Sequence, residues 1–367
     1  MKNLSQNNFF FLAIGGLIFF GLLMLSSASA VISSNKWGDD YHLLKQQAIN
    51  GIIPGLILFF AAGYFPYRRL KKFAMPLMLA SIFLLALLFV PGLGVSIKGA
   101  TRWLDLGIIS FQPSEILKLA VVVYLAALFE SHKKNSSDET KGKFLPFAVI
   151  SAVITALLIS QPDLGTLGVV LGIAFMMYFA AGAKATHMLA VALLGLAGLA
   201  AFVIISGHGL DRIDVFLNPH SDKLGSGYQI SQATGVIASG GYFGLGFGAF
   251  QEKAGSRLPE PMGDSIFAIV AQELGFAGVL AVIALLVALG WYGFKIAKSS
   301  RDEFGALFVT GVIVWILIQS FINIGAISGF LPLTGIPLPF VSYGGTSLAI
   351  LLTACGIVYN IQKTSLN

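Results

Sequence analysis

Four stretches of this 367-residue chain bring together acidic, basic and hydroxyl side chains that could do chemistry. In the most informative one, 258–276, Asp264 lies directly before a long apolar run and Glu260 lies just ahead of it. A carboxylate at the mouth of a membrane helix lies where water meets lipid, so its surroundings can tune its pKa. Its position alone is equally that of a helix cap. Glu273 falls deeper, and we expect it to pair with a cation because a buried charge needs a partner.

A second stretch places basic and acidic residues around the start of an apolar helix. Glu115 and Lys118 are three residues apart, so they share a helical face and should pair inside the bundle, either as a structural ion pair or as a functional one. Gln112 precedes them. Lys98 and Arg102 could neutralise phosphate groups, or could simply extend their charged ends to the membrane interface.

The third and fourth stretches are turns between apolar runs. Gln161-Pro-Asp163 opens a helix, where we expect Asp163 to act as the cap. The stretch 332–347 contains three prolines and predicts a rigid re-entrant turn. Ser342 offers a hydroxyl there, and Gly344-Gly345 offers backbone N–H groups that could receive an anion. The alternative is a purely structural elbow.

Composition indicates what must position these residues. The chain is 56% hydrophobic and only 11% charged, whereas soluble domains average about 25% charged residues. A mean hydropathy of +0.84 with long uncharged runs indicates a polytopic membrane protein. The net charge of +6 comes from basic residues in short loops, which is typical of topology determinants and gives no reason to expect nucleic acid as a partner. The single cysteine, Cys355, excludes an internal disulfide.

We predict an all-α polytopic membrane protein that forms one integral membrane domain over 1–367. Its helices should number about ten, each with about 20 apolar residues. We place them near 9–33, 47–65, 73–91, 113–130, 144–160, 163–182, 185–206, 264–297, 304–330 and 343–362.

The connections between these helices predict an orientation. The basic residues gather in alternate loops, so the positive-inside rule places both termini in the cytoplasm. The loops at 34–46, 92–112, 207–263 and 331–342 then face outward. The loop 207–263, between the seventh and eighth helices, is rich in glycine and aromatic residues, so we expect it to be ordered and partly embedded in the membrane.

In this order and on this topology, the four stretches resemble the FtsW/RodA family, the SEDS (shape, elongation, division and sporulation) proteins of bacteria. The resemblance runs from the first helix to Asn360, and Tyr228-Gln229 after Gly227 is closer to the FtsW branch. The motifs that establish it are Lys98-Gly-Ala-Thr-Arg102-Trp103, Gln112-Pro-Ser-Glu115, Gln161-Pro-Asp-Leu-Gly-Thr166, Leu258-Pro-Glu260, Asp264 and the stretch from Pro332 to Ser347.

The resemblance implies a peptidoglycan glycosyltransferase that polymerises lipid II in the bacterial inner (plasma) membrane, for cell division or cell-shape maintenance. It also implies a class B penicillin-binding protein, a transpeptidase, as partner. The essential acidic residue of the family falls on Asp264. The chain departs from the family pattern around it: Met262-Gly263 replaces His-Thr, Ser265 replaces Phe, and Gln272 replaces the first Glu of a Glu-Glu pair. These changes bear on how the aspartate is hydrogen-bonded.

On this interpretation Asp264 is the general base that takes the proton from the C4 hydroxyl of an acceptor sugar. One carboxylate without a covalent intermediate predicts inversion at the donor's anomeric carbon. The departing diphosphate needs positive charge, and a divalent cation (Mg²⁺ or Mn²⁺) could assist. The candidate substrate-binding residues are Lys98, Arg102, Gln112, Glu115, Lys118, Asp163, Arg212, Gln229, Lys253, Glu260 and Ser342.

Two other classes of function remain open from the sequence. A transporter or flippase of the same lipid would use Glu115, Lys118 and Glu273 as a polar path, although we find no convincing inverted repeat. A non-catalytic scaffold would recruit the transpeptidase. In a scaffold Asp264 would be only a helix cap, replaceable by Asn or Ser.

Overall fold

The computed structural model describes residues 2–97, 100–105, 107, 110–130, 139–183, 186, 188–189, 193, 195, 215–218, 222, 225–253 and 258–366. The predicted all-α polytopic class is confirmed. Six described helices are long and apolar enough to cross a membrane, and 144–160 and 164–180 are shorter apolar helices. The expected span 185–206 lies mostly outside the described residues, so the total of ten spans stays a prediction.

The elements follow one another as a helical bundle with one small sheet. The N-terminal part comprises α1 (Lys2–Trp37), α2 (His42–Gln47), a π-helical turn (Ala48–Ile52), α3 (Ile53–Tyr64), a 3₁₀ turn (Tyr67–Arg69) and α4 (Leu70–Leu87). The middle comprises β1 (Gly94–Ile97), β2 (Ala100–Asp105), β3 (Ser110–Phe111), α5 (Pro113–Phe129), α6 (Glu139–Ser160) and α7 (Leu164–Ala180). The last part comprises α10 (Ser226–Ser239), α11 (Ala249–Lys253), α12 (Ile266–Lys298), α13 (Glu303–Ile327) and α14 (Gly345–Leu366).

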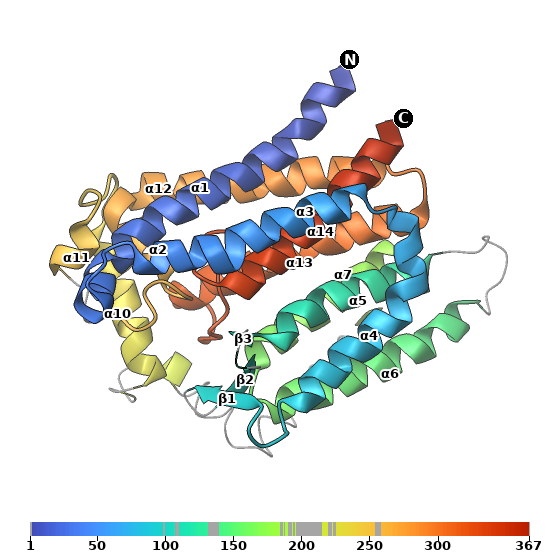
Figure 1. Cartoon of the computed structure of the whole chain (residues 1–367), viewed down its shortest axis with the longest axis horizontal. Helices are drawn as coiled ribbons and strands as arrows, with labels where there is room; N and C mark the ends of the chain where they lie inside the picture. The colour runs from blue at the N-terminus through green and yellow to red at the C-terminus, as the bar shows by residue number, and fades with distance from the viewer. Residues whose placement is uncertain are drawn as a thin grey trace.

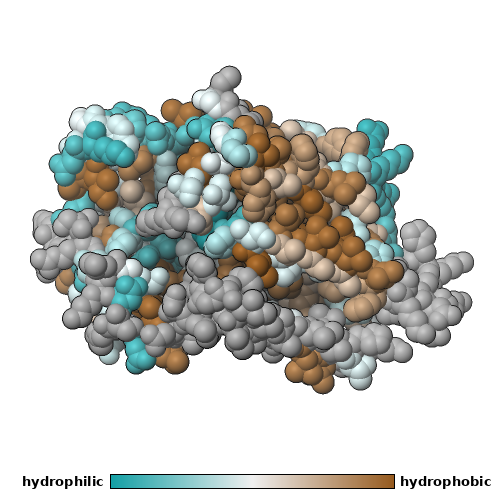
Figure 2. All heavy atoms as spheres, turned by 90° about the horizontal axis from the view of Figure 1, so that it is seen from below, coloured by the Kyte–Doolittle hydropathy of each residue, from teal (hydrophilic) through white to brown (hydrophobic). Residues whose placement is uncertain are grey.

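The long helices lie side by side, with α13 at the centre of the bundle (Figure 1). Helix α13 packs against α5, α7 and α12, while α1 packs along α12 and α3 along α14. Figure 2 shows a broad band of hydrophobic side chains over the bundle, with more hydrophilic residues toward its ends. This distribution is the one expected of a protein whose middle lies in lipid.

Close helix packing explains two glycines four residues apart, Gly51 in the π-helical turn and Gly55 in α3. A Cβ on Gly51 would lie 3.2 Å from the Cα of Gly345, and a Cβ on Gly55 would lie 3.2 Å from the Cα of Ala349. Small residues therefore let the backbones of α3 and α14 approach closely, which is how membrane helices associate without a hydrophobic driving force between them.

The end of the bundle that holds both chain termini is fixed by a polar network around Asp302. Its Oδ1 accepts from the N–H of Gly305 (2.8 Å) and caps α13, and its Oδ2 accepts from the Tyr67 hydroxyl (2.7 Å) and the Arg68 guanidinium (2.8 Å). Burial alone would raise the pKa of Asp302, but these hydrogen bonds outweigh it and hold the pKa below its usual value. The carboxylate thus joins the start of α4 to the start of α13.

Two features of the N-terminal third of the chain differ from the sequence expectation. The predicted loop 92–112 contains an antiparallel sheet in the order β1-β2-β3, in which Val95 pairs with Trp103 and Leu104 with Phe111. The first helix begins at Lys2, where we expected it near residue 9. The sheet was missed because its strands are only two to six residues long.

Helix α12 is broken at Gly275, whose φ of +66° and ψ of −161° lie outside the helical region. The segment 240–248 lies against this break and pairs with its backbone. Leu245 donates to the C=O of Gln272 (2.9 Å), and Phe276 donates to the C=O of Gly241 (3.0 Å). The groups that a regular helix would pair within itself are therefore paired with a neighbouring segment, as buried backbone requires.

Candidate active site

Asp264 lies on a tight turn, residues 260–265, that leads into α12. We call it the acidic turn. The N–H groups of Gly263 and Ser265 both donate to the C=O of Glu260 (3.2 Å each), which closes the turn. Glu260 has a φ of +48°, an uncommon conformation for a residue with a side chain. The N-cap of α12 is Ser265, so Asp264 is not the cap that its position alone left open. Asp264 as a whole residue is 9% exposed.

Gln229 of α10 holds the Asp264 carboxylate from one side. Its side-chain amide donates to Asp264 Oδ2 and to Ser265 Oγ, at 3.2 Å in both cases. The Ser265 hydroxyl in turn donates to the C=O of Pro259 (2.9 Å). The serine that stands where the family usually has phenylalanine therefore contributes hydrogen bonds to the acidic turn.

Asn323 of α13 fixes the same turn through hydrogen bonds to backbone carbonyls. Its amide Nδ2 donates to the C=O of Asp264 (2.8 Å) and to the C=O of Ile336 (2.7 Å). One turn earlier, Gln319 donates to the C=O of Pro337 (2.9 Å). Because residues four apart share a helical face, one face of α13 fixes both the acidic turn and the elbow 332–342.

Gln319 and Asn323 were not among the predicted site residues. The available signal was a pair of amides four residues apart inside an otherwise apolar span, which is costly unless both are hydrogen-bonded. Their partners are backbone carbonyls in turns far along the chain, and no local pattern names those partners.

The predicted pair of Glu115 and Lys118 forms inside the bundle. Lys118 Nζ lies 2.8 Å from Glu115 Oε1 and 2.8 Å from Gln319 Oε1. Lys118 also lies 5.2 Å above the ring of Trp315, whose indole N–H donates to Gln319 Oε1 (2.8 Å). The two charged side chains are 2% and 1% exposed, so here they support Gln319 and the elbow and are not open to a substrate.

Arg102 and Asp163 meet beside the acidic turn. The guanidinium Nη2 of Arg102 donates to the C=O of Pro162 (2.7 Å) and lies 3.7 Å from Asp163 Oδ1. Asp163 Oδ1 also accepts from the N–H of Thr166 (3.3 Å), so the predicted cap of α7 is confirmed. Asp163 is buried, with 3% exposed, and Arg102 is the more exposed partner.

The arginine and the catalytic candidate converge at Gly335. A Cβ at this glycine would lie 3.9 Å from Arg102 Nη1 and 3.9 Å from Asp264 Oδ2. Its φ of +69° also favours glycine. The absence of a side chain at this position thus leaves a small space that a cationic group and a carboxylate both face. A donor for an anion and an acceptor for a proton therefore border the same position.

Polar groups of the elbow and of residues 343–344 after it are bonded to the elbow itself or to α2. Ser342 Oγ accepts from the N–H of Leu338 (2.8 Å), and the N–H of Gly344 donates to Gln47 Oε1 (3.0 Å). Tyr343 donates from its hydroxyl to Gln46 (3.0 Å). These contacts favour the structural alternative for the elbow.

The remaining candidates divide into described and undescribed residues. Gln112 is half-buried at the N-cap of α5, and its C=O accepts from the N–H of Glu115 (3.1 Å). Lys98, Arg212 and the side chain of Lys253 lie outside the described residues. Within the described ranges, no group of three or more His, Cys, Asp or Glu side chains is arranged to hold a metal ion.

The expectation that Glu273 pairs with a cation is wrong. Its Oε1 accepts from the Ser27 hydroxyl (2.6 Å) and from the N–H of Phe250 (3.3 Å), and no ion pair to it occurs in the part of the chain that the structure describes. Glu273 is fully buried and joins α1 to α11 and α12. Neutral donors thus satisfy Oε1, whereas Oε2 has no hydrogen-bond partner among the described residues.

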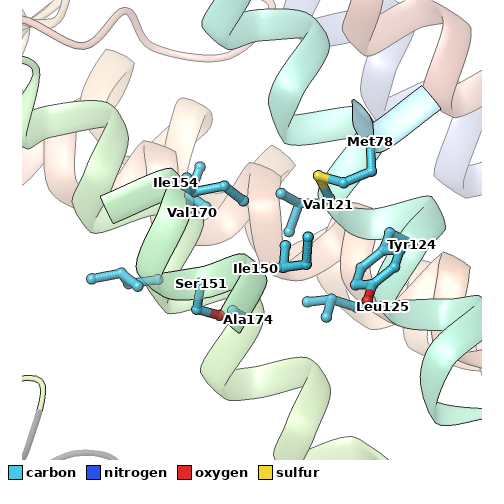
Figure 3. A pocket seen from close by; sticks show the side chains of 10 residues that line it. Met78, Val121, Tyr124, Leu125, Ile150, Ser151, Ile154, Val170 and Ala174 are labelled. Atoms are coloured by element: carbon cyan, nitrogen blue, oxygen red, sulfur yellow. The ribbon is translucent and has the colours of Figure 1, made fainter. Parts of the chain in front are cut away.

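A small crevice elsewhere in the bundle is not part of this site. It lies between α4, α5, α6 and α7, and its lining includes Met78, Val121, Ile150 and Val170 (Figure 3). Its lining is almost entirely apolar and its volume is about 10 Å³, no larger than one water molecule. We treat it as a packing gap.

The chain is similar to known proteins in sequence. The family profile for FtsW, RodA and SpoVE, described as "Cell cycle protein", matches residues 7–367. Stage V sporulation protein E of Bacillus subtilis strain 168 is 39% identical over 338 residues, which are 92% of this chain and 91% of the relative. A probable peptidoglycan glycosyltransferase FtsW of Geobacter sp. strain M18 is 36% identical over 333 residues, covering 91% and 90% of the two chains.

Solved structures match over almost the whole length. A chain of a structure titled for the coordination of polymerization and crosslinking by a peptidoglycan synthase complex has a TM-score of 0.80 and 29% identity, with 97% of both chains covered. Rod shape determining protein RodA of Thermus thermophilus has a TM-score of 0.71 and 27% identity, with 98% of this chain and 97% of RodA covered. The chain therefore belongs to the FtsW/RodA/SpoVE family.

Proposed function

We propose that this member of the FtsW/RodA/SpoVE family is a peptidoglycan glycosyltransferase that polymerises lipid II into glycan strands, in cell division or cell-shape maintenance. The names of its relatives support the activity. The observation that carries the proposal is the pairing across Gly335, where the Asp264 carboxylate and the Arg102 guanidinium face one space. A glycosyl transfer from a diphosphate needs these two groups, a proton acceptor and a cation, at neighbouring positions.

Asp264 acts as the general base. Its carboxylate takes the proton from the C4 hydroxyl of the acceptor sugar, and the oxygen bonds to the anomeric carbon of the donor. The bond from that carbon to the diphosphate oxygen breaks, and its electron pair leaves with the lipid diphosphate. One displacement at one carbon inverts an α-linked donor to a β-linked product. Base catalysis of this kind is typically worth about 10²–10⁴-fold.

Arg102 binds the departing diphosphate. Its Nη2 is held by Pro162 and Asp163, so the guanidinium is already oriented before substrate arrives. Preorganised charge of this kind costs no rearrangement in the transition state. Gln229 orients the Asp264 carboxylate through Oδ2. Asn323 fixes the backbone of the acidic turn from α13.

The scaffold alternative has less support than the enzyme. In a scaffold Asp264 would serve only as the N-cap of α12, but the N-cap residue is Ser265. An acidic residue that is 9% exposed, next to an amide and near an arginine, has the surroundings of a reacting group.

We further propose the location and partners. The protein lies in the bacterial inner membrane with both termini in the cytoplasm and Asp264 at the outer face. In support, the two termini lie away from α10, α11 and the acidic turn (Figure 1), and basic residues follow the positive-inside rule. The match to a peptidoglycan synthase complex supports a class B penicillin-binding protein as partner.

The experiment compares wild type with Asp264→Asn in lipid II polymerisation by the purified protein and its cognate transpeptidase. Asp39→Asn is the matched control, because Asp39 is an acidic residue at the same end of the bundle that pairs on the surface with Lys45 (2.7 Å). We expect Asp264→Asn to lose at least about 10²-fold in rate with an unchanged melting temperature and partner binding, and Asp39→Asn to polymerise normally.

Two results would count against the proposal. Normal glycan chains from Asp264→Asn would remove the base assignment. A folded wild-type complex that makes no glycan would favour the flippase or the scaffold.

A further inference from the structure

We propose that the segment 240–248 is an interfacial anchor: its aromatic side chains lie in the bilayer interface on the side of Asp264 and fix the depth of the broken helix α12. The proposal concerns contact with lipid and stands independently of the reaction.

The segment is attached rigidly to α12. Besides the two bonds across the Gly275 break described above, Gly246 donates to the C=O of Glu273 (3.1 Å) and Ala277 donates to the C=O of Tyr242 (3.2 Å). A Cβ on Gly244 would collide with the backbone of Glu273. Wherever residues 272–277 lie in the membrane, this segment lies at the same level.

Its large side chains point away from the protein. Tyr242 is 80% exposed, Phe243 88% and Phe247 60%. They continue onto an apolar face of α12 that begins with Phe276, 59% exposed, and Leu280, 54% exposed. Exposed apolar side chains gathered near one another mark an interaction site, and the segment contains no charged residue that could pair with a charged protein surface.

The length of the uncharged part of α12 gives the depth of the Gly275 break in the membrane. Lys295 lies 5.3 Å from the ring centre of Trp291 and 5.2 Å from that of Tyr292, a basic and aromatic group typical of a membrane interface. From Lys295 back to Gly275 the helix has no other charged residue. These twenty residues rise about 30 Å, the thickness of the hydrocarbon core. The break therefore lies at the opposite boundary.

Helix α1 gives the same level independently. Its stretch 9–25 is apolar without interruption, bounded by Asn8 at one end and by Ser26 and Ser27 at the other. The nineteen steps from Asn8 to Ser27 rise about 28 Å. Ser27 donates to the carboxylate of Glu273 (2.6 Å), two residues before the break. The end of this uninterrupted stretch therefore lies at the level that α12 gives for the segment 240–248, and α1 continues beyond it to Trp37.

Aromatic side chains at this level are the usual interfacial anchors, because a ring with an apolar body tolerates the boundary between acyl chains and headgroups. Tyr242 can also keep its hydroxyl in the headgroup region. The occupant of this surface is therefore the lipid interface. Another protein covering it is an outcome that the test below separates.

The test measures depth with spin labels in the full-length protein, reconstituted in bilayers of phosphatidylethanolamine and phosphatidylglycerol. Cys355 is fully buried, so wild type provides the unlabelled baseline. Nitroxides are attached to Phe243→Cys and Phe247→Cys. The lipid control is Val287→Cys, 63% exposed in mid-span, and the water control is Asp40→Cys, exposed in the loop after α1.

The readout is the ratio of collisions with oxygen, which partitions into lipid, to collisions with a water-soluble nickel chelate. We expect the ratio at 243 and 247 to shift clearly from the Asp40→Cys value toward the Val287→Cys value. A ratio equal to that of Asp40→Cys would overturn the proposal, because the segment would then lie in water. Shielding from both reagents would also overturn it, because protein would then cover the segment.

A second variant guards against a label that prevents folding. Phe243→Trp adds one indole at the most exposed of the three positions. We expect lipids brominated near the headgroup end of the acyl chain to quench its added emission, measured as the difference from wild type. An added emission that only a water-soluble quencher reduces would contradict the anchor.

Discussion

Replacing Lys118 by methionine should leave the buried carboxylate of Glu115 without its cationic partner. Lys118 is the only described cation within ion-pair distance of Glu115, and the pair is almost completely shielded from water. Gln319 keeps its donor from Trp315 when Lys118 is gone, so its oxygen remains satisfied. Glu115 Oε1 loses its Nζ donor, and its Oε2 has no hydrogen-bond partner among the described residues.

The loss of this partner determines how far the free energy of unfolding should fall. Removing one partner of a buried ion pair typically costs about 3–5 kcal/mol, because the other charge stays buried without compensation. Replacing both partners by apolar residues of similar length is often neutral. Lys118→Met alone should therefore lose about 3–5 kcal/mol of unfolding free energy, whereas Glu115→Leu with Lys118→Met should come within about 1 kcal/mol of wild type.

The assay is equilibrium unfolding in mixed micelles, with Glu115→Leu alone completing the double-mutant cycle. A single Lys118→Met variant as stable as wild type would refute the reasoning, since the charge would then not be buried in the folded state. A double variant as unstable as the single one would refute it differently, by showing that packing and not charge determines the loss.

Three further predictions concern other parts of the structure. Asn323→Ala leaves two carbonyls, including that of Asp264, without their donor, at about 1–3 kcal/mol each; we expect a polymerisation rate lowered about 10²-fold by the displaced turn. Gly244→Ala should destabilise the fold by at least about 1–3 kcal/mol, because its φ is +80° and its Cβ would meet the Glu273 backbone. Asp302→Asn should be less stable than wild type at pH 7, with the difference vanishing as pH falls through the lowered pKa of this carboxyl, below its ordinary 3.8.

Each of these predictions has its own check. A wild-type rate for Asn323→Ala would show that the turn is fixed without it. Gly235→Ala is the control for Gly244→Ala: a Cβ at Gly235, inside α10, meets nothing within 4 Å, so this change should be neutral or stabilising. For Asp302, unfolding is followed from pH 7 down through the lowered pKa of its carboxyl. A difference from Asp302→Asn that persists below the lowered pKa would show that charge is not its source.

The sequence alone predicts those parts of the site that depend on neighbours along the chain. Glu115 and Lys118 pair because three residues place them on one helical face, and Asp163 caps α7 because its short acidic side chain directly precedes the first helical residue, Leu164. The all-α membrane class follows from the long apolar runs. Asp264 was identified by its position and by resemblance to a family, and Gln229 by the resemblance.

Other contacts join segments that only the fold brings together. Gln319 and Asn323 bond to carbonyls of Pro337, Ile336 and Asp264, which no periodicity indicates. Glu273 was expected to find a cation, but its partners are a hydroxyl and an N–H from two other helices. The break in α12 was hidden because glycine is common in membrane helices, and its donors and acceptors are satisfied by a segment some thirty residues earlier.

The two amides on α13 have a consequence for how such a chain can diverge. A helix turns about 100° per residue, so one inserted residue between Gln319 and Asn323 would rotate one amide away from the carbonyls that the other still reaches. Connections other than the acidic turn and the elbow 332–342, which hold those carbonyls, can change length without disturbing these bonds. Selection should therefore tolerate insertions and deletions in most connections of this protein and remove them from the two turns of α13 that precede Asn323.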